Sequence, residues 1–199
     1  MKKLLLVFAM FAGTTFSASA QVQQGSILVD VYYAMPNLYK SIFEAAASSV
    51  DATNVKTGGI GPVGIRAEWM AAEKFGFGID LCYSDVYVKE DAMGSDGMMY
   101  NYEIRSPKIG IMATMNYHIF TTEVLDFYFI AGGGYKSRTL RSTADDPNYT
   151  TESINLSLTN IAARVGVGTR IFFTENIGIN LGLGIGQGSI LNAGVSMKF

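Results

Sequence analysis

Hydrophobic and polar residues alternate strictly in one stretch near the end of the chain. In residues 177–188, IGINLGLGIGQG, isoleucine or leucine occupies every second position from Ile177 to Ile185, with glycine or asparagine between them. A period of two is that of a β-strand, whose successive side chains point to opposite faces. One face is therefore bulky and apolar and the other nearly bare. Whether the apolar face meets a core or lipid decides the class of the protein.

The same alternation recurs along most of the chain and predicts about eight strands. The expected strands cover residues 27–33, 63–70, 75–84, 108–118, 127–136, 161–171, 177–186 and 194–199. Runs of roughly 9–11 residues match the length of a tilted strand that crosses a bilayer.

The connections between these strands alternate in length. Long polar segments at 35–57, 89–100 and 141–153 contrast with tight turns at 72–74, 121–123 and 174–176. Short turns on one side and long loops on the other are typical of outer-membrane barrels. The final hairpin, near 187–192, is short although it belongs to the long-loop side. In the first long segment, PNLYKSIFEAAASS has a proline near its start and good helix formers after it, which predicts a short helix.

Charged residues fall on the face opposite the apolar one. A charge that faced lipid near mid-depth would cost several kcal/mol, so this face must point inward. The expected interior charge network comprises Asp30, Arg66, Glu68, Asp80, Lys108, Arg164, Arg170 and Lys198.

Aromatic residues cluster near the strand ends and predict two girdles at the membrane interfaces. The expected girdle on the short-turn side comprises Trp69, Phe75, Tyr117, Phe127 and Phe173, and that on the long-loop side Tyr33, Tyr83 and Tyr135. A soluble sandwich or lipocalin-like barrel also alternates, with its apolar residues inside. It needs neither girdle, nor a glycine-rich opposite face, nor a terminal phenylalanine. The sequence thus predicts an all-β fold, a single antiparallel up-and-down transmembrane β-barrel of about eight strands, whose lumen is filled by side chains.

The start of the chain has the features of a secretory signal peptide. Lys2 and Lys3 precede an apolar run that is too short for a membrane helix, and SASA ends at Ala20. We expect residues 1–20 to be the signal peptide and residues 21–199 the barrel domain. Without the two lysines the formal charge falls from −2 to −2 − 2 = −4, which argues against nucleic-acid binding. Cys82 is the single cysteine, so an internal disulfide is excluded.

These features resemble those of the outer-membrane protein β-barrel domain family, the small OmpX-like, porin-family barrels of Gram-negative bacteria. The resemblance rests on the signal peptide ending SASA, on IGINLGLGIGQG and on the last strand AGVSMKF, and it covers residues 24–199. It implies an outer-membrane location among lipid and lipopolysaccharide. It also implies that Val195, Met197 and Phe199 form the signal read by the barrel-assembly machinery. The family includes adhesins, structural proteins, narrow channels and a few enzymes, so the resemblance predicts architecture better than function.

Two functional hypotheses remain. The first is a monomeric structural or adhesive barrel whose long loops bind an extracellular ligand, with contact candidates Tyr39, Phe43, Met98, Met99 and Tyr149. The second is a narrow channel for small or apolar solutes, lined by Arg66, Asp80, Arg164 and Arg170.

Enzymatic chemistry has little support in the sequence. A lipid-modifying enzyme would have His118 as its one histidine base, and we expect that residue to be interfacial or to contact a turn. The acidic segment EDAMGSDG does not have the spacing of a calcium loop. We therefore expect no catalytic residue, cofactor or metal.

Overall fold

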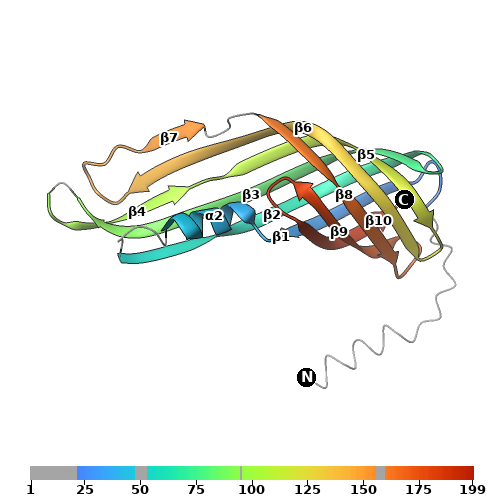
Figure 1. The fold of residues 1–199 in the computed structure, drawn as a ribbon, viewed down its shortest axis with the longest axis horizontal. Helices are drawn as coiled ribbons and strands as arrows, with labels where there is room; N and C mark the ends of the chain where they lie inside the picture. Colours follow the sequence, from blue (N-terminus) through green and yellow to red (C-terminus); the bar gives the residue numbers. More distant parts are fainter. Residues whose placement is uncertain (1–21, 48–52, 95, 156–159) are drawn as a thin grey trace, which may run out of the picture.

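Eight strands form a closed antiparallel ring in the computed structural model, which describes residues 22–47, 53–94, 96–155 and 160–199 (Figure 1). Pairing of the last strand with the first, which sets Ser196 opposite Asp30, closes the ring. Closure leaves no unpaired edge within the barrel. The predicted antiparallel up-and-down barrel is therefore confirmed. In order around the ring, the strands are β1 (Ile27–Met35), β2 (Thr53–Ala72), β3 (Phe75–Met93), β5 (Lys108–Thr121), β6 (Leu125–Ala144), β8 (Ile161–Phe172), β9 (Ile177–Gly186) and β10 (Leu191–Lys198).

The barrel has its apolar side chains outside and its polar ones inside. Along β5, buried and exposed residues alternate without interruption from Lys108 to Ile119. Outward and inward side chains differ strongly in exposure: Trp69 is 55% exposed, whereas Arg170 is 0% exposed. A soluble barrel has the reverse arrangement. The soluble alternative is thus wrong, and the exterior suits hydrocarbon.

Beyond the ring, the chain forms a sheet that the sequence did not predict. Two further strands, β4 (Met99–Arg105) and β7 (Glu152–Asn155), pair with extensions of β3 and β6, while β2 pairs with β3 from Thr53 onward. We call this extension, residues 53–60, 85–93, 99–105, 138–144 and 152–155, the protruding sheet; Figure 1 shows it reaching well past the other strands. The expected loops 89–100 and 141–153 are therefore partly strand.

The predicted short helix is present as α2 (Leu38–Ala47), which lies against β2 and β3. The backbone N–H of Leu38 donates to the carbonyl of Gly188 at 3.0 Å, which ties the helix to the β9–β10 turn. The predicted signal peptide lies outside the described residues. Among the residues that are described, no helix is long and apolar enough to span a membrane.

Candidate functional site

A buried arginine joins four strands near the short-turn end of the lumen. Arg170 of β8 donates from Nε and Nη2 to Asp30 at 3.0 and 2.8 Å, from Nη2 to Glu68 at 2.7 Å, and from Nη1 to Asp126 at 2.9 Å. These carboxylates come from β1, β2 and β6. A planar guanidinium has five N–H donors in a fixed fork, which suits it to several acids at once.

His118 of β5 completes this arrangement. Its Nδ1 lies 2.6 Å from Asp126 Oδ1 and its Nε2 lies 2.8 Å from Glu68 Oε1. Two ionised carboxylates can only accept hydrogen bonds, so this geometry fits a doubly protonated, charged imidazole that donates from both ring nitrogens. The residues Arg170, His118, Asp30, Glu68 and Asp126 are called the ionic cluster below.

A second ion pair extends the network toward the middle of the lumen. Arg66 donates to Asp80 Oδ2 from Nε at 3.1 Å and from Nη2 at 2.9 Å, and its Nη1 lies 3.6 Å from Asp30. The Tyr32 hydroxyl donates to the other oxygen of Asp80 at 2.7 Å. Fixed side chains from several strands therefore cross the lumen.

The bare glycine face makes room for these side chains. Tyr32 lies over Gly64 and Tyr128 over Gly168, each opposite its glycine in the strand pairing, and a Cβ at either glycine would overlap the ring. The Tyr128 ring in turn lies 4.4 Å from the Arg170 guanidinium. The two glycines thus make room for Tyr32, which lies over Arg66, and for Tyr128, which lies over Arg170 of the ionic cluster.

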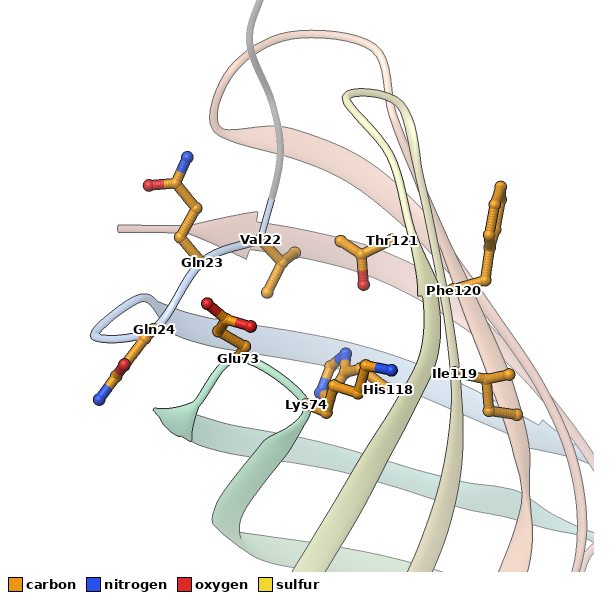
Figure 2. Close-up of a pocket in the computed structure, with 9 residues that line it drawn as sticks. All are labelled: Val22, Gln23, Gln24, Glu73, Lys74, His118, Ile119, Phe120 and Thr121. Carbon is orange, nitrogen blue, oxygen red and sulfur yellow. The ribbon is translucent and has the colours of Figure 1, made fainter.

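At the short-turn rim, the lumen ends in an apolar plug beside a polar pocket. Val22, Leu28, Met70 and Phe172 form the buried apolar cluster. The pocket has a volume of about 670 Å³ and opens beside His118 (Figure 2). Its walls come from the N-terminal segment, the β2–β3 turn and the end of β5, and comprise Val22, Gln23, Gln24, Glu73, Lys74, His118, Ile119, Phe120 and Thr121. In the part of the chain that the structure describes, no group of three or more histidine, cysteine, aspartate or glutamate residues is placed to hold a metal.

Seven of the eight expected interior charges are buried inside the barrel. Asp30, Glu68 and Arg170 meet in the ionic cluster, Arg66 pairs with Asp80, and Lys108 and Arg164 lie toward the long-loop end. The eighth, Lys198, is half-buried at the rim, with its ammonium 5.7 Å from the centre of the Phe172 ring.

Sequence reasoning missed two members of the ionic cluster. Asp126 lies two residues before Tyr128, on the same buried face of β6, so the alternation itself contained the signal. His118 was expected at the interface. Its backbone N–H does contact the β2–β3 turn, donating to Lys74 O at 2.8 Å, but its side chain is fully inside.

The expected girdle residues and the C-terminal residues lie on the outer face. Tyr33, Trp69, Phe75, Tyr83, Tyr117, Tyr135 and Phe173 are exposed, and Phe127 is half-buried. Val195 and Phe199 are exposed on the outer face of β10, and Met197 between them is half-buried.

The protruding sheet carries apolar side chains in contact with solvent. Met93, Met98 and Met99, around the β3–β4 hairpin tip, are 69%, 63% and 56% exposed. At this tip the Tyr100 hydroxyl donates to Asp96 at 2.7 Å. That hydrogen bond lowers the pKa of the Asp96 carboxyl and raises the pKa of Tyr100 to about 12.

The other loop candidates differ in exposure. Tyr149 packs edge-on against Tyr102, with ring centres 5.5 Å apart, and Phe43 is half-buried. Tyr39 stacks on the guanidinium of Arg138, 3.6 Å from its ring centre. Of the five predicted contact residues, Met98 and Met99 are therefore the two that are exposed.

Closure, an apolar exterior and a lumen filled with ion pairs define the class of protein as a small β-barrel built to sit in a membrane. No protein-family model and no curated protein matches the chain.

Among solved structures the chain is similar to three barrels at low identity. The N-terminal β-barrel domain of Pseudomonas aeruginosa OprF is 16% identical, with a TM-score of 0.42, over 89% of this chain and all of that one. Ail, the attachment invasion locus protein of Yersinia pestis, is 10% identical, with a TM-score of 0.45, over 88% and 99% of the two chains. The outer membrane protein OprG of Pseudomonas aeruginosa is 12% identical, with a TM-score of 0.44, over 93% and 99%.

Proposed function

We propose that this protein is an integral outer-membrane barrel that anchors the protruding sheet outside the cell, where the sheet binds a partner surface. The observation that carries the proposal is the sheet itself, which continues the barrel wall and exposes Met93 and Met99, with Met98 beside Met99 in the β3–β4 turn. Methionine side chains are flexible and polarizable, and clustered exposed apolar residues mark contact surfaces.

The orientation of the barrel supports this role. The short turns and both ends of the described chain lie at one rim, and the protruding sheet extends from the other. Outer-membrane barrels have their short turns in the periplasm and their longer connections outside. The apolar exterior would contact lipid and lipopolysaccharide, and the outward Val195, Met197 and Phe199 would serve as the assembly signal.

The filled lumen favours a binding role over a channel. Arg170, Arg66 and Tyr32 each reach across to other strands, so a solute would have to break buried ion pairs to pass. His118 has carboxylates on both ring nitrogens, which leaves neither nitrogen to act as a base toward a substrate.

Adhesion of whole cells tests the proposal. Cells that express the full chain should adhere to cultured epithelial monolayers or to one another more than cells without it. The triple variant Met93→Ser, Met98→Ser and Met99→Ser should lower that adhesion about tenfold, because it removes the apolar contact and leaves the barrel unchanged.

Ile42→Ser is the matched control, since Ile42 of α2 is also an exposed apolar residue on the loop side but lies outside the protruding sheet. Surface amounts of each variant are compared by labelling intact cells. Equal adhesion of the triple variant and wild type, at equal surface amounts, would overturn the proposal.

A further inference from the structure

Two buried cations at the long-loop end of the lumen have only neutral partners. Lys108 of β5 is 2% exposed and donates from Nζ to the backbone carbonyl of Gln187 at 2.5 Å. Arg164 of β8 is 4% exposed and donates from Nη1 to the side-chain Oε1 of the same residue at 3.0 Å. Within the described residues, no carboxylate forms an ion pair with either one. Buried charges in proteins are normally paired, so this site lacks its counter-ion.

Two donors in this region are left without a hydrogen bond. Arg164 Nε and Ser84 Oγ are both buried and have no partner in the structure. Ser84 lies directly opposite Lys108 in the pairing of β3 with β5. Asp80 could have served as an acceptor, but it is engaged by Arg66 and Tyr32. Arg164 Nε and Ser84 Oγ can both donate a hydrogen bond to an anion.

The β9–β10 turn places a neutral amide where that anion would be expected. Gly186, Gln187 and Gly188 have φ values of 118°, 57° and 89°, three consecutive residues in the left-handed region. This conformation turns the Gln187 side chain into the lumen, where it is buried between Arg164 and the Met112 sulfur. The short final hairpin therefore places the Gln187 side chain inside the loop-side end of the lumen.

We propose that Lys108, Arg164 and Ser84 form a binding site for one small oxyanion, a phosphate or carboxylate group, which replaces the side-chain amide of Gln187. The anion would accept from the Arg164 guanidinium, including its unpartnered Nε, from the Lys108 ammonium and from the Ser84 hydroxyl. Charge-assisted hydrogen bonds of this kind are stronger than those to a neutral amide. The site lies inside the barrel and is independent of the adhesive role of the protruding sheet.

Binding can be measured on residues 21–199 refolded in an uncharged maltoside detergent, which has no phosphate headgroup. Inorganic phosphate and acetate are titrated separately against chloride at equal ionic strength, with calorimetry for stoichiometry and the heat-dependent gel mobility of the barrel for stability. We expect one phosphate or acetate per chain. The midpoint of heat unfolding should rise by roughly 5 °C at about 100 times the dissociation constant. The stronger of the two ligands identifies the oxyanion class.

Three variants test the site itself. Arg164→Gln should lose the oxyanion response, whereas Arg141→Gln, at an exposed arginine, should retain it. Gln187→Glu should raise the heat-unfolding midpoint without added anion and abolish the response, because the new carboxylate supplies the missing counter-ion. A wild-type response no larger than that to chloride would overturn the proposal, as would equal responses of Arg164→Gln and Arg141→Gln.

Discussion

A single guanidinium, that of Arg170, neutralises acids from three other strands, and its removal should be costly. Arg170→Met would leave Asp30, Glu68 and Asp126 buried with only His118 and Arg66 as remaining cations. Removing one partner of a buried ion pair typically costs 3–5 kcal/mol, so we expect a loss of about that size. Urea titration of the folded fraction in lipid vesicles measures it. Arg141→Met, at an exposed site, should change stability by less than about 0.5 kcal/mol; equal losses in the two variants would contradict a central role for Arg170.

Gly168 should be intolerant of even one methyl group. A Cβ there would overlap the Tyr128 ring, which covers both Arg170 and His118. Overpacking of this kind costs about 1–3 kcal/mol, and Gly168→Ala should lose that much stability in the same urea titration. Gly133→Ala is the control, because its new Cβ would meet open space. If the two variants unfold at the same urea concentration, the close fit of tyrosine on glycine does not matter for stability.

The inward direction of individual charges could be predicted, but their pairing could not. Alternation alone places Asp30, Glu68 and Arg170 on one face of their strands. Which of them meet depends on how far each strand is staggered against the next around the ring. Asp30 and Arg170 are 140 residues apart and their strands are not adjacent, so no local pattern indicates their contact.

At the scale of elements, the β3–β4 hairpin tip offers a titration that can be observed. Because Asp96 accepts the Tyr100 hydroxyl, Tyr100 has its pKa raised to about 12 and the pKa of Asp96 is lowered. The stabilisation that the Tyr100 hydroxyl gives to the hairpin tip is present below its unfolded pKa of about 10. It is lost as pH rises through about 12. The Asp96 contribution is present above the unfolded carboxyl pKa and is lost as pH falls through the lowered folded value.

Tyrosine-ring carbon NMR across pH 8–13 would follow this titration, with Tyr100→Phe to assign the signal. Asp96→Asn should move the midpoint down toward about 10, because the charged acceptor is gone. An unchanged midpoint in Asp96→Asn would show that the hydrogen bond does not form in solution.

The element boundaries show where the hydrophobic pattern stops being informative. Inside the bilayer, one face of each strand must be apolar, so the eight ring strands were visible in the sequence. In the protruding sheet, polar residues such as Lys89, Glu90 and Asp91 form strand although they resemble a loop. The inward turn at Gln187 could not be predicted from the sequence either, because its conformation is stabilised by lumen residues of the distant strands β5 and β8.

For the whole molecule, the arrangement predicts a barrel that does not conduct. Refolded residues 21–199 in planar bilayers should give no steady single-channel steps. The ion pairs of Arg170 and Arg66 and the apolar plug around Met70 obstruct the lumen at successive depths. Replacing residues 38–47 by a glycine–serine linker tests whether α2 alone blocks the loop-side opening of the lumen. This variant should also give no single-channel steps. Steps in the linker variant but not in the wild type would show that the helix blocks the lumen. Steps in the wild type would contradict the filled lumen and make passage of small solutes, through a path lined by Arg66, Asp80, Arg164 and Arg170, the better account of the protein.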